Sequence, residues 1–313
     1  TFFLIPICFC QNIFAQNGDF KAYKQDIPGT GKSFSMVAVP AGSFIMGSDE
    51  KAIIKKVDEQ PAHKVTIEAF WMGAYEVTYD EYDEFSKDQT LSHDVEVDAV
   101  ARPTPPYIDL TLGMGKEGGF PANSMQQFGA IMYCKWLYKK TGVFFRIPTE
   151  AEWEYACRAG STTAYPFGND SSALGKYAWY AKNSGGHYHK VGELQPNNWG
   201  LYDMLGNVGE WTLDQYNENF YSKTTDGANS PLLVPTTKHP RVVRGGTYRD
   251  DADITRSAAR IKSDAVWNRR DPQVPKSKWW NADAPFIGFR IIRPLKQPTA
   301  DEAAAFYDQY LKK

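Results

Sequence analysis

The sequence predicts a globular fold of short strands and a few helices, with little regular secondary structure in its second half. Its 313 residues are 42% hydrophobic and 14% aromatic, which is enough to bury a sizeable core in one large domain or two small ones. Capping boxes mark helix starts at Thr78, Ser124 and Thr149. Between Gly160 and Arg241 the chain lacks periodicity and is rich in Gly, Asn, Trp and Tyr, which predicts turns packed on buried aromatic side chains. We find no internal repeat.

The first strands are expected after a polar segment. Residues 17–34 are polar, contain a Pro-Gly pair and are predicted to be a linker. Alternation over 36–39 and 43–47, around a Pro-Ala-Gly turn, predicts two short strands. Residues 64–67 and 70–72 have the composition of further strands.

Helices are expected in the middle of the chain. The Thr78 capping box opens a short helix that ends near Lys87. The best helix is predicted from Ser124 to about Lys140, closed by a glycine. A third helix is predicted over 151–159, with one apolar face.

The remaining segments are a long loop, two strands and a tail. Residues 101–121 are rich in Pro and Gly and are predicted to be a surface loop. Short strands at 242–243 and 289–292 are expected to close the sheet. Residues 298–313 are expected to form a C-terminal tail with a short helix.

The N-terminal segment is typical of a secretory signal. Residues 2–15 are largely apolar and run into a polar Gln-Asn-Gly, but the apolar run is too short to span a bilayer. We expect residues 1–16 to be a signal peptide and the mature protein to be secreted or periplasmic, with cell-surface association left open. The alternative is a buried N-terminal strand. Cys8 and Cys10 lack the small preceding residues typical of a lipid-attachment site.

The charge pattern argues against two classes of partner. The chain has 35 basic and 37 acidic residues and a formal net charge of -2, without a long run of like charge. We therefore predict neither nucleic acid nor an anionic membrane surface as a partner. Nothing indicates membrane attachment after signal cleavage.

Six segments carry the motifs of one known family, in the order that the family has them. They are Val39–Gly47, Tyr75–Thr78, Arg146–Arg158, Gly200–Trp211, Arg244–Gly246 and Gly288–Arg290. The chain resembles the formylglycine-generating enzyme (sulfatase-modifying factor) family on these residues. The resemblance implies a single α+β domain over residues 35–297, with a C-type-lectin-like fold and little regular secondary structure.

The resemblance also implies that the family's oxidase chemistry is missing. In true formylglycine generators, two cysteines a few residues past the Gly-Gly bind copper as thiolates and use oxygen to oxidise a sulfatase cysteine. By register the first of these positions falls at Asp250, and the segment with the second is shortened. A carboxylate is a hard ligand and does not replace a thiolate toward Cu(I). We therefore expect neither copper nor formylglycine-generating activity.

Two further cysteines match positions that form disulfides in many members. The resemblance pairs these helix cysteines, Cys134 and Cys157, with late positions that here are Ser257 and Ile291. Both bridges therefore lose one end. Cys134 and Cys157 could pair with each other, but two buried free thiols is the favoured interpretation.

The resemblance implies a structural calcium site. Asp203 and Glu210 fall on its side-chain positions, and Gly206 and Val208 on its backbone-carbonyl positions. Hard oxygen ligands in a tight loop suit Ca²⁺, so we expect the site to be occupied. The alternative is that the carboxylates only accept backbone hydrogen bonds. Gly209 departs from the tryptophan that relatives often carry there.

Two late segments are candidates for ligand binding. The acidic turn with Asp250, Asp251 and Asp253 is either a site for a hard cation or basic ligand, or a solvated turn. The loop 262–284 is long enough to be functional, and its Trp and Arg side chains are typical anchors of binding surfaces; the alternative is that they pack a core. These side chains are Trp267, Arg269, Arg270, Trp279 and Trp280.

Two hypotheses for the function follow. The first is a secreted binding or scaffold protein for a protein or glycan ligand, with its groove between the Asp250 turn and the loop 262–284. The family includes non-oxidase members of this kind. The second is an oxidoreductase or other metal-dependent enzyme on the same fold, with acidic residues and the His187 and His189 pair as ligands. Such a pair in a glycine-flanked loop is more often a surface feature.

Overall fold

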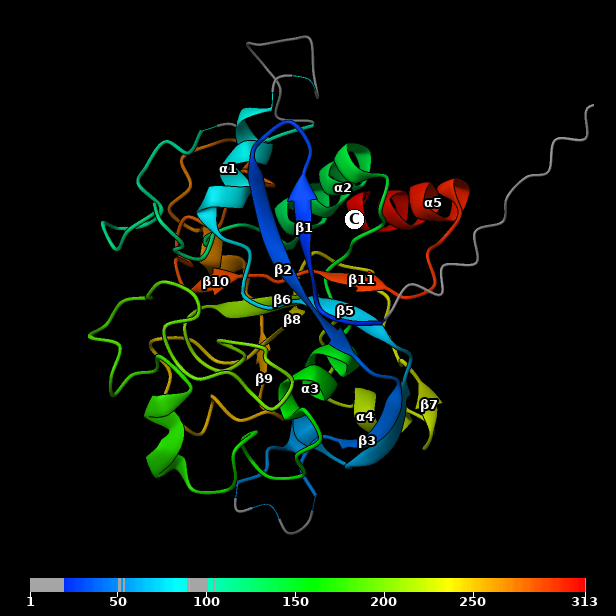
Figure 1. The fold of residues 1–313 in the computed structure, drawn as a ribbon. Coiled ribbons are helices and arrows are strands. Elements are labelled where there is room, and N and C mark those ends of the chain that lie inside the picture. The colour runs from blue at the N-terminus through cyan, green and yellow to red at the C-terminus, as the bar shows by residue number, and fades with distance from the viewer. Residues whose placement is uncertain are drawn as a thin grey trace, which may run out of the picture.

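The structure is a computed structural model of the chain, drawn in Figure 1. It describes residues 20–49, 52, 54–88, 90, 101–103 and 105–312. The predicted signal peptide, Cys8, Cys10 and His93 lie outside the described residues.

The fold is α+β, as predicted, and the elements are short. The helices are α1 (Tyr79–Lys87), α2 (Gln127–Thr141), α3 (Glu150–Arg158), α4 (Phe220–Lys223) and α5 (Ala300–Leu311). The strands are β1 (Tyr23–Ile27), β2 (Lys32–Val39), β3 (Gly42–Met46), β4 (His63–Ile67), β5 (Phe70–Gly73), β6 (Gly209–Gln215), β7 (Ala228–Asn229), β8 (Arg241–Arg244), β9 (Arg260–Lys262), β10 (Ile287–Gly288) and β11 (Ile292–Pro294). Between α3 and β6 the chain forms turns and one short 3-10 helix, which confirms this part of the predicted turn-rich region; the part after residue 208 instead contains β6, α4 and β7.

Three small sheets join distant parts of the chain. The first has the order β1-β2-β5-β11, so the last strand closes the sheet that the first strands begin. The second has the order β10-β6-β8-β9, with β10 parallel to β6. The third has the order β3-β4-β7.

The expected linker over residues 17–34 is wrong for its second half, because residues 23–34 form β1 and the start of β2. The two strands make an antiparallel hairpin in which Tyr23 lies opposite Met36 and Ile27 opposite Lys32. Only alternate side chains are buried in these strands, so a strand with one solvated face has the composition of a linker. β2 and β3 do not pair with each other, because the turn between them carries the chain into a different sheet.

The capping boxes at Thr78 and Thr149 are confirmed. The predicted start of α2 at Ser124 is wrong, because the helix begins at Gln127. Ser124 has a left-handed backbone, with φ of 62°, and its hydroxyl donates to the Leu110 carbonyl at 3.2 Å. The C-terminal helix is confirmed as α5.

The predicted strand over 289–292 is wrong for residues 289–291, which lie between β10 and β11; only Ile292 belongs to a strand, β11. Between them the Phe289 and Ile291 carbonyls accept hydrogen bonds from Val77 and Gly73 at 2.9 Å each. Two carbonyls of this segment therefore bind the stretch 73–77, although the segment is not a strand.

The described residues form two large hydrophobic cores and a small third cluster of Tyr188, Val208 and Tyr248. The first is built around α1, α2 and α5, and it contains Trp136, Trp211 and Phe289. α2 and α5 lie side by side in Figure 1. The second surrounds α3 and contains Trp153 and Cys157. Among the described residues, the helices are too short or too polar to cross a membrane.

Candidate functional site

Helix α3 is buried on all sides, which is unusual for a helix with four charged residues. Trp153, Ala156 and Cys157 pack in the second core, as the apolar spacing predicts. Glu150 and Glu154 are 1% and 0% exposed, and their spacing places them beside Cys157 on the helix surface. Charged side chains are almost never fully buried unless they are paired, so this side of α3 must contact cations.

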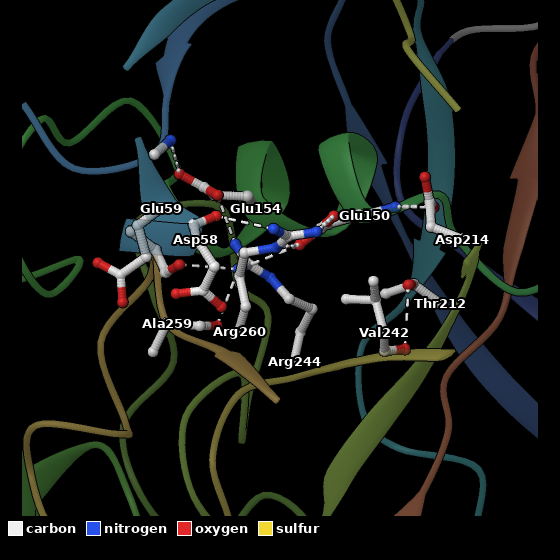
Figure 2. Close-up of polar contacts among 12 residues, drawn as sticks. Asp58, Glu59, Glu150, Glu154, Thr212, Asp214, Val242, Arg244, Ala259 and Arg260 are labelled. Carbon is white, nitrogen blue, oxygen red and sulfur yellow. Dashed lines mark hydrogen bonds and ion pairs between the residues drawn. The ribbon is translucent and has the colours of Figure 1, made fainter. Parts of the chain in front are cut away.

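Two of these cations are Arg244 from β8 and Arg260 from β9 (Figure 2). Arg260 holds Glu150 through two hydrogen bonds of 2.6 and 3.0 Å. Arg244 reaches Glu154 and also donates to the Ala258 and Ala259 carbonyls at 2.9 and 2.8 Å. Paired guanidinium and carboxylate groups with further hydrogen bonds are the form in which buried charges are tolerated.

The same cluster extends toward the N-terminal part of the chain. Arg256 binds Glu59 through two hydrogen bonds of 2.8 and 2.6 Å, and Arg158 binds Glu154 at 2.9 Å. Burial opposes ionisation of Glu59, but the contacts from Arg256 and Ser48 outweigh it and lower the Glu59 pKa. Glu59 therefore stays charged and paired with Arg256.

A pocket of about 590 Å³ adjoins this cluster. We call it the β3–α3 pocket, because its walls are β3, the end of α3, the segment 160–164 and Trp199. Arg158 and Arg256 belong both to the pocket lining and to the ion-pair cluster. The Arg158 guanidinium also donates to the Gly47 carbonyl at 2.8 Å, which ties the end of α3 to the end of β3.

A row of three aromatic rings runs along the β3–α3 pocket. Phe44 and Tyr155 have ring centroids 5.3 Å apart, and Tyr155 and Trp199 are 5.0 Å apart. Ser161 and Thr163 supply hydroxyl groups on the facing segment. Pockets of this size, apolar with a few polar groups, are the usual form of ligand sites.

The charges that line the β3–α3 pocket are balanced. Arg158 and Arg256 form ion pairs with Glu154 and Glu59, respectively. Asp49 and Lys64 lie at the exposed rim, one of each sign. The pocket therefore offers aromatic faces and neutral hydrogen-bonding groups, without a net charge to attract an ionic ligand.

The predicted calcium ligands are only partly free. Both oxygens of Glu210 are held by Arg290 at 2.7 and 2.6 Å, and Trp153 donates to one of them at 2.7 Å. Asp203 accepts a hydrogen bond from the Gly192 amide at 2.7 Å through one oxygen. Its other oxygen is buried and has no partner.

A carboxylate that the sequence did not indicate joins this site. Glu76 is 1% exposed, accepts a hydrogen bond from Asn207 at 3.1 Å and has a second, buried oxygen without a partner. Burial and the neighbouring Asp203 raise the pKa of Glu76, and burial raises that of Asp203 to about 6. Asp203, Glu76 and Glu210 exceed the single cation Arg290 by two charges when all are ionised, so the residues fit a divalent cation.

Backbone geometry also favours a tight loop here. Gly206 has φ of 74°, and a Cβ there would lie 2.1 Å from the Trp179 carbonyl oxygen. Only glycine fits such a position. Val208 is buried beside it. Any cation at Asp203 and Glu76 would need backbone carbonyls as well, because no group of three or more His, Cys, Asp or Glu side chains converges within the described part of the chain.

The Asp250 turn does not form a convergent acidic site. Asp250 is half-buried and accepts a hydrogen bond from Thr247 at 2.8 Å. Asp251 and Asp253 are exposed. Burial raises the pKa of Asp250.

Cys134 and Cys157 are buried, unpaired thiols, as the favoured interpretation predicts. Burial raises the pKa of Cys157 to about 12, and the contact with the Ser257 hydroxyl offsets this only in part. Burial also raises the Cys134 pKa far above its ordinary value. Neither thiol therefore ionises readily.

The loop 262–284 packs much of its aromatic content inward. Trp279 is 1% exposed and lies against Phe128, with ring centroids 4.9 Å apart. Trp267 packs against Trp211, with ring centroids 5.8 Å apart. Trp280 is half-buried near Tyr82.

The two arginines of this loop are exposed. Arg270 pairs with Asp283, and Arg269 lies beside it in the sequence. Neither these side chains nor Asp250 line the β3–α3 pocket. The candidate binding residues are therefore dispersed, and the Trp residues mainly support the first core.

The histidine pair forms a ring stack. The ring centroids of His189 and Trp179 are 3.7 Å apart, with an interplanar angle of 13°. Those of His187 and His189 are 4.5 Å apart. One His189 nitrogen contacts the Ser184 carbonyl at 2.8 Å. This arrangement uses the rings for packing against each other.

Solved structures with the same arrangement define the class of the fold. PvdO from Pseudomonas aeruginosa is 28% identical, with a TM-score of 0.67 over 87% of this chain and 98% of that one. Treponema denticola variable protein 1, at 22% identity, shares the fold with a TM-score of 0.64 over 87% of this chain and 99% of that one. Both structures have the α+β architecture described above.

The chain belongs to the sulfatase-modifying factor enzyme 1-like domain family, whose model matches residues 25–295. It is 30% identical to the bovine formylglycine-generating enzyme over 255 residues, covering 68% of this chain and 65% of that protein. The match thus spans a little less than two thirds of the bovine enzyme. Bovine inactive C-alpha-formylglycine-generating enzyme 2 is 27% identical, covering 72% of this chain and 80% of that protein. The family therefore contains members without the activity, and a non-catalytic role is compatible with membership.

Proposed function

We propose that this protein is a secreted or periplasmic binding protein of the family, without copper-thiolate oxidation, and that it holds its ligand in the β3–α3 pocket. The observation that carries the proposal is this pocket of about 590 Å³ with its row of three rings. The absence of the catalytic thiol supports it, because Asp250 occupies the position of the first copper ligand by register. The relatives named inactive support it as well.

The chemistry of the pocket favours a neutral glycan. Its two arginines are already neutralised, so an acidic ligand gains little from them. Aromatic rings contact the apolar faces of sugars, and hydroxyl groups such as those of Ser161 and Thr163 exchange hydrogen bonds with sugar hydroxyls. A glycan presents both surfaces together.

A binding experiment tests the pocket. Wild-type protein and Trp199→Ala are applied to a panel of immobilised neutral oligosaccharides, with Tyr107→Ala as the control. Tyr107 is an exposed aromatic residue outside the β3–α3 pocket. We expect Trp199→Ala to weaken binding roughly tenfold or more and Tyr107→Ala to leave it unchanged. Wild-type protein that binds no oligosaccharide, or binding that Trp199→Ala leaves intact, would overturn the proposal.

A second experiment tests the loss of oxidase chemistry. The protein is incubated with a cysteine peptide of the sulfatase type, copper and oxygen, and the product is analysed by mass spectrometry. We expect no aldehyde. Aldehyde formation would show that the argument from Asp250 is wrong.

We also propose that Asp203 and Glu76 hold a structural Ca²⁺ together with backbone carbonyls of the loop that contains Gly206 and Val208. The support is the pair of buried carboxylate oxygens without partners. The ion would supply charge neutralisation and fix the loop, and Glu210 would stabilise it from its ion pair with Arg290.

A further inference from the structure

A second pocket, at the C-terminal end of α5, differs from the β3–α3 pocket in its charge. It has a volume of about 170 Å³ and lies between the start of α2, the segment before β8 and the end of α5. We call it the α5 pocket. Four of its lining residues are Lys or Arg, and none is acidic. Its walls therefore carry more basic than acidic groups.

Arg241 is the buried part of this charge. Its side chain is 4% exposed, its Nε donates to the Lys238 carbonyl at 3.2 Å, and its Nη1 is buried without a partner. Arg244, on the same strand, instead reaches Glu154 and Glu150. Burial without an anion lowers the pKa of Arg241 to about 10.

A buried guanidinium without a carboxylate is costly, because desolvation is not offset by an ion pair. The neighbours of Arg241 do not relieve this cost. Tyr310 lies close to it and Trp211 lines the same pocket, but neither is charged at neutral pH. An anion in the α5 pocket would supply the missing counter-charge.

Three lysines at the rim add to the positive potential. Lys238 and Lys278 are exposed, and the Lys278 ammonium lies 4.6 Å from the centre of the Phe128 ring. Lys312 pairs with Asp308 at 3.1 Å on the surface of α5.

The acids closest to the rim stay outside the pocket. The negative charge of Asp271 favours the charged form of Lys238, and that of Asp264 favours the charged form of His239. Neither acid lines the pocket. Both therefore reduce the charge of the rim without reaching Arg241. The buried end of the pocket remains positive.

We propose that the α5 pocket binds a small tetrahedral oxoanion of the phosphate or sulfate type, free or as a group on a larger ligand, with Arg241 as its buried anchor. Arg is suited to this task because its guanidinium offers several donors in one plane. The volume equals that of about five or six waters at about 30 Å³ each, which accommodates an anion of five heavy atoms. No part of the proposal depends on the ligand of the β3–α3 pocket.

The test is calorimetric titration of the whole protein at constant ionic strength, with sodium chloride as the balancing salt. Inorganic phosphate, sulfate and glycerol phosphate are compared, and glycerol is the uncharged control. Binding of glycerol phosphate as tightly as phosphate indicates a group on a larger ligand, whereas binding of the inorganic ions alone indicates a free ion. Both outcomes support the site.

Two variants connect binding to the pocket. Arg241→Met keeps an unbranched apolar stem without the charge and is expected to weaken phosphate binding roughly tenfold or more. The double variant Lys238→Ala and Lys278→Ala changes only exposed residues, so it reports on the pocket even where Arg241→Met does not fold. We expect it to weaken binding several-fold, whereas Lys182→Ala, an exposed lysine away from the pocket, leaves it unchanged.

The melting temperature gives a second measurement. Phosphate should raise that of the wild-type protein, and at the same phosphate concentration it should raise that of Arg241→Met by much less. Wild-type protein without saturable binding of phosphate or sulfate would overturn the proposal. So would binding that the rim variant and every folded Arg241 variant retain in full.

Discussion

Ser257→Cys is expected to create a disulfide bond with Cys157. Ser257 lies near enough to Cys157 for its hydroxyl to lower the pKa of the thiol, and both residues are 0% exposed. The family resemblance pairs the same two positions. Because burial raises the Cys157 pKa to about 12, the thiol is a poor nucleophile in the folded protein, and the bond should form during oxidative folding.

The size of the effect follows from the length of chain that the bond closes. Residues 157 and 257 are separated by 257 − 157 = 100 positions, and the loss of chain entropy in the unfolded state for such a loop is about 4.7 kcal/mol. Measured disulfides usually contribute about 2 to 4 kcal/mol. At about 2 °C per kcal/mol for a protein of this size, we expect the melting temperature to rise by about 4 to 8 °C.

The assay compares the variant before and after reduction. Mass spectrometry of a non-reduced digest identifies the bond, and thermal unfolding with and without a reductant measures its contribution. Ser257→Ala is the matched control, because it removes the hydroxyl without adding a thiol. Free thiols at both positions after oxidative folding, or a melting temperature insensitive to reduction, would refute the placement of Ser257 beside Cys157.

Three further predictions concern the buried carboxylates. Ca²⁺ should raise the melting temperature of the wild-type protein, because a hundredfold excess over Kd adds about 2.7 kcal/mol to the free energy of unfolding. Asp203→Asn should abolish most of this rise. An equal rise in the variant would contradict the site. Glu154→Gln should cost about 3 to 5 kcal/mol in urea unfolding, because it leaves buried arginines without their partner, whereas Glu117→Gln at an exposed position should change stability by less than about 0.5 kcal/mol. Burial raises the Glu81 pKa to about 7 from about 4.3 in the unfolded chain. Between these two pH values the folded state therefore holds a proton that the unfolded state releases. The protonated carboxyl contributes its full stability below about pH 4, and this contribution is lost as the pH rises through about 7. Glu81→Gln, which keeps the capping box, should therefore gain on the order of 3 kcal/mol relative to wild type between pH 4 and 8; parallel pH profiles of the two proteins would contradict this.

Local signals in the sequence predict the helices well and their surroundings poorly. The capping boxes at Thr78 and Thr149 depend on residues within one turn, so they are visible in the sequence. Ser124 has the same signature, but contacts with Leu110 and Ile287 hold it in a non-helical conformation. Those contacts come from distant segments, which a pattern of neighbours does not contain.

The candidate site shows the same limit more strongly. Motif resemblance indicates Asp203 and Glu210. It does not indicate that Glu210 forms an ion pair with Arg290, or that Asp203 and Glu76 each keep a buried carboxylate oxygen without a partner. The charged side of α3 has the composition of a solvated surface, because the arginines that pair with it lie about 90 to 110 residues later. Spacing along the chain carries no information about such pairs.

The closure of the first sheet by β11 has a consequence for the order in which the chain can fold. During synthesis, β5 keeps an unpaired edge until residue 294 is available, and β6 lacks its parallel partner until residue 288. Unpaired edges are templates for pairing with other chains, and pairing over such a separation is slow. We therefore expect a fragment that ends before β10 to expose two strand edges and aggregate. The domain can complete its fold only after its last two strands have been translated.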